Sequence, residues 1–255
     1  MTSVLVVRKF DNFSRILTAK GFSVLICPTI ETVESENLRG LAAQIAAKNY
    51  DGIFLTSPKA SEIAAREIFC KNFRYHGKVY VLGKSSFERL RDKNLDLFFI
   101  ETADTAREML AAIPPEDLKN RRFLFMRGDK SLGTVRGFLE KYAALDETIV
   151  YETRQIRVAE ALRKEIEADL KNGAIRAACF FSPSGAESFL KQFGKDALHR
   201  TKIAAIGTTT AEFFAGQDLK TDFTAPRATA EDFANGLAEY LRNFQPRLIK
   251  KGKLF

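Results

Sequence analysis

The chain has 255 residues, of which 45% are hydrophobic and 28% are charged, a balance that is ordinary for a globular protein of one or two domains. No apolar run approaches the roughly 20 residues that a membrane span requires, and Arg8 follows the first apolar run, whereas a signal peptide carries its charge before it. The formal net charge is +8, but five basic residues and no acidic one follow Glu239, so this charge is weak evidence for a nucleic-acid partner.

Short apolar runs that favour β-strands alternate along the chain with segments of helical pattern. The first expected elements are strand 4–7, helix 10–20, strand 23–28, helix 38–48, strand 52–56, helix 60–70, strand 79–82, helix 86–93, strand 97–100 and helix 105–112. After a Pro-Pro break come strand 122–126, helix 133–142, strand 148–153, helix 160–172, strand 177–181, helix 185–193, strand 202–206, helix 210–216 and helix 232–243. Continuous apolar strands in this alternation predict parallel sheets covered by helices on both faces.

One pattern occurs twice in the chain. Residues 53–58, Ile-Phe-Leu-Thr-Ser-Pro, reappear as residues 178–183, Ala-Cys-Phe-Phe-Ser-Pro. Each copy is followed by a helical stretch and then by a short apolar strand that ends in glycine, Gly83 in the first copy and Gly207 in the second. The repeat predicts two similar lobes that face one cleft, an arrangement suited to a large ligand with many anionic groups.

Periodicity leaves the division into lobes open. The two copies of the theme start near Val4 and near Phe123, but the extended segments 28–32 and 150–153 look like matching crossings. If the chain crosses between lobes at both segments, one lobe is continuous and the other is built from both chain ends.

Four strand-to-helix junctions carry hydroxyl side chains. Ser57 is placed to cap a helix with Pro58 at its first position, and the matching junction is Ser182-Pro183-Ser184. The other two junctions follow the glycine-ended strands and read Lys84-Ser85-Ser86 and Thr208-Thr209-Thr210. Three pairs have the spacing of a capping box: Ser184/Glu187, Ser85/Glu88 and Thr209/Glu212.

These junctions have two interpretations. Each could simply cap its helix, which contributes about 1 kcal/mol per site. Alternatively, the unpaired N–H groups of a helix N-terminus bind phosphates or carboxylates, and in doubly wound folds these loops lie at the carboxyl ends of the strands, where ligands bind. Neither Gly83 nor Gly207 begins a dinucleotide fingerprint or a P-loop.

The three cysteines are odd in number and far apart, so they predict neither a disulfide framework nor a metal site. Cys27 and Cys179 lie in apolar strand-like runs, where an inert buried thiol is expected. His76 and His199 are isolated and suggest no metal. We therefore expect a reduced, cytoplasmic protein without a bound metal.

At the repeated motifs the chain resembles the uroporphyrinogen-III synthase family. The similar segments are residues 54–58 after Tyr50-Asp51, residues 180–185 and residues 204–211, and residues 5–8 stand where the family has its opening strand and arginine. The order of motifs matches from the first strand to about Leu241. Thr208 replaces a common proline, and Lys84-Ser85-Ser86 replaces a threonine-alanine pattern, which makes the contacts of that loop less defined.

The resemblance implies a fold of two α/β lobes, each a parallel sheet flanked by helices, joined by a two-stranded connection with the active-site cleft between them. One lobe would comprise residues 1–30 and 156–243 and the other residues 34–150, with crossings near 29–34 and 151–157 and a basic tail at 244–255.

The resemblance also implies an activity. The expected enzyme needs no cofactor and belongs to tetrapyrrole and heme synthesis: it takes the linear tetrapyrrole hydroxymethylbilane, removes its hydroxyl as water and closes the ring with ring D inverted. We expect a monomer that acts on this small molecule and has no nucleic-acid or membrane partner. A transient contact with the preceding or following pathway enzyme is left open.

Tyr151 falls at the family's tyrosine and is the expected catalytic residue, because a phenol is protonated at neutral pH and can donate to a leaving hydroxyl. The alternative is a tyrosine that packs on the connecting ladder. Arg8 and Arg127 follow matching strands and could neutralise carboxylates or form salt bridges. The expected substrate contacts are Arg8, Ser57, Lys84, Ser85, Arg127, Ser182, Ser184, Gly207, Thr208, Thr209 and Thr210.

Two other functions fit parts of the pattern. A non-catalytic two-lobed protein could bind a polycarboxylate metabolite with the same loops and leave the isomer composition unchanged. A nucleic-acid binder would show steep salt dependence, but the sequence holds no recognised nucleic-acid module. Deleting the residues after Asn243 would abolish tail-driven binding and leave a cleft enzyme largely unaffected.

Overall fold

The computed structural model describes residues 2–38, 40–70 and 74–243, and in it the chain divides into two compact units. Unit 1 combines Met1–Ile30 with the chain from Gln155 onward, and unit 2 is Glu31–Arg154. The chain therefore passes between the units twice, between Ile30 and Glu31 and between Arg154 and Gln155. The predicted basic tail, residues 244–255, lies outside the described residues.

The sheet of unit 1 has five parallel strands in the order β11-β10-β9-β1-β2. The strands are β1 (Ser3–Val6), β2 (Ser23–Ile26), β9 (Ile175–Phe180), β10 (Lys202–Ala205) and β11 (Phe223–Thr224). The helices are α1 (Asn12–Ala19), α7 (Glu160–Asn172), α8 (Pro183–Phe193), α9 (Thr208–Ala215) and α10 (Ala230–Asn243), with a 3₁₀ turn at Asp196–Leu198.

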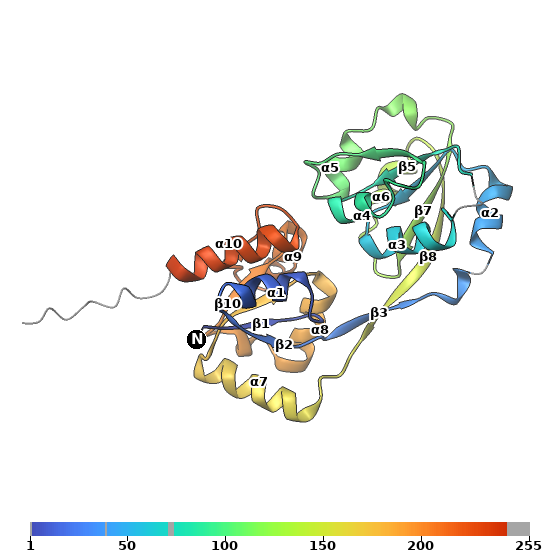
Figure 1. The fold of residues 1–255 in the computed structure, drawn as a ribbon. Helices are drawn as coiled ribbons and strands as arrows, with labels where there is room; N and C mark the ends of the chain where they lie inside the picture. Colours follow the sequence, from blue (N-terminus) through green and yellow to red (C-terminus); the bar gives the residue numbers. More distant parts are fainter. Residues whose placement is uncertain (1, 39, 71–73, 244–255) are drawn as a thin grey trace, which may run out of the picture. The chain divides into compact units, whose positions relative to one another are not determined.

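Helices cover both faces of this sheet (Figure 1). On one face, α1 and α10 contribute Phe13, Leu17 and Phe233 to a core that includes Val4 and Val6 of β1. On the other face, α7, α8 and α9 contribute the members Ile166, Phe189 and Phe214 of a second core. The apolar strands predicted from the sequence are therefore buried between two helical layers, which is why they lack an alternating pattern.

The sheet of unit 2 has the order β3-β8-β7-β4-β5-β6, and the pairs from β8 to β6 are parallel. The strands are β3 (Ile30–Glu34), β4 (Gly52–Leu55), β5 (Lys78–Val81), β6 (Asp96–Phe99), β7 (Arg122–Gly128) and β8 (Ala144–Gln155). The helices are α2 (Leu41–Lys48), α3 (Pro58–Glu67), α4 (Lys84–Glu88), α5 (Ala106–Ala111) and α6 (Thr134–Leu139), with 3₁₀ turns at Glu36–Leu38 and Pro115–Asp117.

The two units have the same strand topology. The order β6-β5-β4-β7-β8 corresponds, strand by strand along the sequence repeat, to β11-β10-β9-β1-β2. In unit 2, Ile63 of α3 packs in a core on one face and Met109 of α5 and Val135 of α6 pack on the other. The predicted fold class, α/β with parallel sheets flanked by helices, is confirmed in both units.

The resemblance implied a two-stranded connection, but the apolar runs did not give the bounds of its strands. The expected strand 148–153 extends over the whole of β8, and β3 is a separate strand beside it. Ser35 N–H donates to Val150 and Ile156 N–H donates to Thr29, so the two segments run in opposite directions. β8 carries charged residues such as Asp146 and Glu147, which hide a strand from an analysis of apolar runs.

Each end of the connection is fixed to a helix that begins at a hydroxyl junction. The buried Thr29 donates to the carbonyl of Gly185 in α8 and accepts from Ser188, at 3.1 and 2.8 Å. In unit 2, Glu34 of β3 pairs with Arg66 and Lys59 of α3 at 2.6 and 2.9 Å. Hydrogen bonds from Arg66 and then Lys59 lower the pKa of Glu34 to about 2.

The three cysteines differ in their exposure to solvent. Cys27 and Cys179 are fully buried in unit 1, and Cys70 is exposed in unit 2. Burial raises the pKa of Cys27 to about 12 and that of Cys179 well above its usual value. No helix in the described ranges has both the length and the apolar character needed to cross a membrane.

An aromatic disulfide reagent should therefore react quickly with one thiol in the native protein and with all three after denaturation. The reason is that the thiolate is the attacking species and only Cys70 is accessible to form it. The measurement is the release of the coloured thiol at about pH 8, with and without guanidinium. Rapid release of two or more equivalents from native protein would contradict the burial of Cys27 and Cys179.

Candidate active site

In unit 1 the strand order reverses between β1 and β9, since β2 lies on one side of β1 and β9 to β11 lie on the other. Ligands of open α/β sheets bind at the carboxyl ends of the strands at such a switch point. Arg8 follows β1 and Ser182 follows β9, so both residues stand at this edge.

Arg8 is held at this edge by two neighbours. Its guanidinium carbon lies 4.4 Å from the ring centroid of Phe181, and its Nη2 lies 3.2 Å from the carboxylate of Asp11. Its side chain remains 41% exposed. An arginine stacked on an aromatic ring keeps its planar donors pointed outward, so Arg8 can meet an anionic ligand without losing its support.

Ser182 and Ser184 differ in what they do locally. Ser182 is the N-cap of α8 and accepts from the N–H of Gly185 at 3.1 Å, with Pro183 in the first helical turn. Ser184 lies inside that first turn and is partly exposed. Its hydroxyl is therefore placed beside the unpaired N–H groups of the helix end.

The third loop of unit 1 leads into α9. The helix begins at Thr208 directly after Gly207, and no side chain caps it. Thr208 is exposed, Thr209 is half-buried and Thr210 is buried. The exposed Thr208 and the half-buried Thr209 thus lie in the first turn of α9, beyond the carboxyl end of β10.

The three predicted capping boxes are wrong. The helices begin earlier than expected, at Pro183, Lys84 and Thr208, so Ser184, Ser85 and Thr209 lie in the first turn and not at the N-cap. A capping box is instead formed by Thr105 and Glu108, at the start of α5. Helix capping therefore does not explain the hydroxyls of Ser184, Ser85 and Thr209.

In unit 2 the corresponding switch point lies between β4 and β7. Ser57 follows β4, and β7 ends at Gly128. Tyr151, from the neighbouring β8, lies opposite Gly128, and its hydroxyl donates to Oγ of Ser57 at 3.1 Å. The structure thus joins the expected catalytic tyrosine to one of the expected substrate-binding serines.

The hydroxyl of Ser57 has a second partner. Ser57 is the N-cap of α3 and accepts from the N–H of Ala60 at 3.2 Å, as the sequence predicted. A serine hydroxyl has two acceptor positions and one proton to donate. Because Ala60 and Tyr151 use both acceptor positions, the proton of Ser57 is left for a third partner.

Arg127 is occupied within unit 2. Its Nη1 donates to the carbonyls of Gly128 and Asp129 at 2.9 and 3.2 Å, and its Nη2 lies 3.3 Å from Glu147, which also pairs with Arg136. Burial opposes ionisation of Glu147, but Arg136 and Arg127 together lower its pKa. Arg127 therefore holds the turn after β7, and a substrate carboxylate would have to compete with Glu147.

The remaining loop of unit 2 is short. Gly83 has a φ of +83°, a conformation that favours glycine, and it leads directly into α4. Lys84 and Ser85 are both exposed. Ser86 is fully buried, and among the described residues its hydroxyl has no hydrogen-bond partner.

The predicted site residues therefore fall into one group in each unit. In unit 1 the shared edge carries Arg8, Ser182, Ser184, Gly207, Thr208, Thr209 and Thr210. In unit 2 it carries Ser57, Lys84, Ser85, Arg127 and Tyr151. Two residues that support these groups, Phe181 and Gly128, were not singled out, although both stand next to a residue that was.

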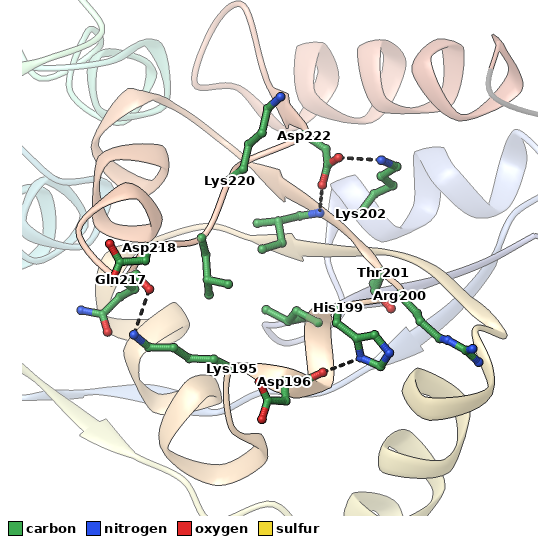
Figure 2. Close-up of a pocket in the computed structure, with 13 residues that line it drawn as sticks. Lys195, Asp196, His199, Arg200, Thr201, Lys202, Gln217, Asp218, Lys220 and Asp222 are labelled. Atoms are coloured by element: carbon green, nitrogen blue, oxygen red, sulfur yellow. Dashed lines mark hydrogen bonds and ion pairs between the residues drawn. The ribbon is translucent and has the colours of Figure 1, made fainter.

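A surface pocket of unit 1 lies at the opposite edge of the sheet (Figure 2). It has a volume of about 500 Å³ and is lined by residues that precede or begin β10 and by residues that precede β11. Lys195 donates to the carbonyl of Gln217, and Lys202 pairs with Asp222 at 2.7 Å. None of the predicted site residues lines this pocket, so it is separate from the candidate active site.

No group of three or more potential metal ligands occurs among the residues that the structure describes. His199, at the pocket of Figure 2, contacts the carbonyl of Asp196 through Nδ1. The switch point of unit 1 offers hydroxyls, a helix N-terminus and the guanidinium of Arg8, and the corresponding loops of unit 2 offer hydroxyls and the exposed Lys84; donors of these kinds suit an anionic ligand.

Comparisons with known proteins agree with this geometry. A solved uroporphyrinogen-III synthetase from Helicobacter pylori covers 95% of this chain and 100% of its own, with a TM-score of 0.59 and 17% identity. A mutant uroporphyrinogen III synthase from the extremely thermophilic bacterium Thermus thermophilus has a TM-score of 0.62 at 16% identity, with the same two coverages. Both likenesses concern the fold.

Sequence comparison identifies the family as well as the fold. A uroporphyrinogen-III synthase from Chlorobaculum parvum is 29% identical over 255 residues, which cover 95% of this chain and 100% of that protein. The family model described as uroporphyrinogen-III synthase HemD matches residues 11–235. Because that match spans most of the chain and both switch points, this protein belongs to the uroporphyrinogen-III synthase family.

Proposed function

We propose that this chain converts hydroxymethylbilane to uroporphyrinogen III, with loss of water and inversion of ring D, and that it uses the two groups of loops described above. The observation that carries the proposal is the pairing of Tyr151 with Ser57 at the switch point of unit 2. It gives the family's reaction a hydroxyl donor at the place where the fold binds ligands.

Binding of the substrate carboxylates is assigned to exposed donors at the carboxyl ends of the strands of both units. The N-termini of α8 and α9 supply backbone N–H groups, and the exposed Thr208 and Ser85 supply hydroxyls. Arg8 supplies a fixed positive charge. Many donors of modest strength can hold a flexible polycarboxylate in one conformation without any single one dominating.

The chemical step begins with the hydroxymethyl group. Its C–O bond breaks while the pyrrole nitrogen donates its electron pair, which leaves a cationic azafulvene, and the departing hydroxyl takes a proton through its hydrogen bond to become water. Ring D loses one proton when the macrocycle closes, so the overall change is the loss of one water. We assign the hydrogen bond to this hydroxyl to the Tyr151–Ser57 pair. Either hydroxyl of the pair can accept from the other, so one O–H is always left to donate outward.

Ring closure then depends on geometry. The substituted carbon of ring D attacks the azafulvene and gives a spiro intermediate, whose rearrangement inverts ring D. The competing attack at the unsubstituted carbon gives the type I isomer without an enzyme. Holding the reacting carbons in one arrangement contributes more here than a strong acid would, because the uncatalysed closure is already feasible.

A polycarboxylate binder without catalysis would use the same loops, and we propose it as less suitable because it gives the Tyr151–Ser57 pair no task. We also propose that the protein acts as a monomer in the cytoplasm, where the three free thiols stay reduced. Sedimentation of the purified chain tests the oligomeric state.

The test of the function is the isomer composition of the product. Fresh hydroxymethylbilane is added to purified protein, and the oxidised products are separated into types I and III. An excess of type III over the protein-free reaction is the expected result. Type I alone, from protein with native circular dichroism, would contradict the synthase and favour the binder.

A further inference from the structure

We propose that Gly128 and a β-bulge at Val150 position Tyr151, the bulge by aiming its side chain and the glycine by leaving room for its ring. The inference deepens the proposed function, because it rests on the role assigned to Tyr151 there. Neither residue needs to touch the substrate, so both are positioning residues.

The bulge sets the direction of the side chain. Arg127 of β7 lies opposite Ile149 of β8, and Gly128 lies opposite Tyr151, so the register shifts and Val150 is the extra residue. Side chains of a regular strand alternate between the two faces of a sheet. Val150 and Tyr151 nevertheless pack against the same core cluster, together with Met126. An extra residue of this kind re-aims the next side chain.

The face chosen by the bulge is the one that α3 covers. Ile63 and Ala64 of α3 belong to the same cluster as Val150, and Ser57 caps that helix. Without the shift, Tyr151 would follow Ile149 to the other face, away from Ser57. The hydrogen bond of 3.1 Å between Tyr151 and Ser57 therefore depends on the extra residue.

The glycine sets the position of the ring. Gly128 alternates with Met126 and so faces the same core. A Cβ atom at Gly128 would lie 2.5 Å from Cε2, 2.6 Å from Cζ and 2.9 Å from the hydroxyl oxygen of Tyr151. These distances are far inside van der Waals contact, so the ring occupies the space that any other side chain would fill.

The residue after Gly128 holds the backbone of β8 at Tyr151 and two residues further on. Asp129 N–H donates to the carbonyl of Tyr151 at 3.1 Å, and its carboxylate accepts from Thr153 N–H at 2.8 Å. β8 cannot simply move outward to relieve a clash at Gly128 without breaking these bonds. A methyl group there must instead displace the tyrosine ring and its hydroxyl.

The first experiment compares turnover of hydroxymethylbilane to type III product. Gly128→Ala should lower kcat about tenfold or more, as expected for losing one hydrogen bond to the reacting group, with a small change in KM. Gly137→Ala is the matched control, because Gly137 lies in α6 with nothing within 4 Å of its added Cβ. It should leave kcat unchanged.

A double mutant separates positioning from general damage. In the Tyr151→Phe background the hydroxyl is already absent, so Gly128→Ala should lower kcat by much less than it does in the native background. An equal factor in both backgrounds would show that Gly128 does not act through the hydroxyl. Native-like kcat for Gly128→Ala would overturn the inference outright.

A second readout does not depend on activity. Gly128→Ala should lower the urea midpoint of the native protein, but not that of Tyr151→Ala, where the ring no longer fills the space. An equal shift in both backgrounds would remove the steric basis of the inference. If the native protein makes no type III product but this coupling is found, the proposed function fails and the packing stands.

Discussion

Tyr151→Phe should lower kcat for type III product by about ten- to a hundredfold while KM changes little. The substitution keeps the ring beside Gly128 and removes only the hydroxyl that pairs with Ser57. A hydrogen bond to a group that gains charge contributes about 1.5–3 kcal/mol, which corresponds to this range of rates. The measurement is steady-state turnover with separation of the isomers.

The same experiment tests whether binding is distributed. We expect the product of Tyr151→Phe to remain predominantly type III, because hydrogen-bond donors other than Tyr151 hold the conformation of the substrate. The control is Tyr142→Phe, a tyrosine of unit 2 whose ring packs near Phe138 in a different core. A second variant, Arg8→Ala, tests the same idea. Complete loss of turnover in folded Arg8→Ala protein would contradict binding by many donors that each contribute a small part of the binding free energy.

Phe233→Ala should destabilise unit 1 by about 3–5 kcal/mol, the usual cost of removing a fully buried phenylalanine. Phe233 is fully buried and lies 4.7 Å from Phe13 and 5.3 Å from Phe181, centroid to centroid. Phe181 in turn supports Arg8, so a weaker affinity for substrate should accompany the loss of stability.

The distribution of tyrosines allows the two units to be followed separately. Five of the six tyrosines lie in unit 2, and the chain has no tryptophan, so tyrosine fluorescence reports mainly on unit 2. Phe233→Ala should move the circular-dichroism transition in urea more than the fluorescence transition. Phe10→Ala, at a ring that is 55% exposed, is the control and should move neither. An unshifted transition for Phe233→Ala would contradict the packing described.

How far the sequence reaches can be judged at particular elements. Ser57 and Pro58 predicted the start of α3, because an N-cap serine and a proline in the first turn are local signals. The same two signals recur at Ser182 and Pro183. The capping-box spacing of Ser184 and Glu187 nevertheless led us to place the start of the helix at residue 185, whereas α8 begins at Pro183. Spacing alone does not show where a helix begins.

Strand β8 marks the other limit of prediction. Its charged residues pair with partners that are distant in sequence: Asp146 accepts from Tyr50 at 2.5 Å, and Glu147 lies beside Arg127. The hydrophobic pattern of the neighbouring residues does not indicate these pairs. The strand was therefore predicted only over residues 148–153. β3 was expected as an extended segment of a two-stranded connection, but its bounds and its pairing with β8 were not.

The sequence by itself determined the alternation of strands and helices, the repeat, the four hydroxyl junctions and the resemblance to one enzyme family, since all of these reside in short stretches of chain. Tertiary structure decided that the hydroxyl of Ser57 pairs with Tyr151. It also decided that Arg127 is committed to Glu147, and that Gly128 gives Tyr151 its place. Those outcomes depend on strand order and register, and a register shift of one residue sends a side chain to the opposite face of a sheet.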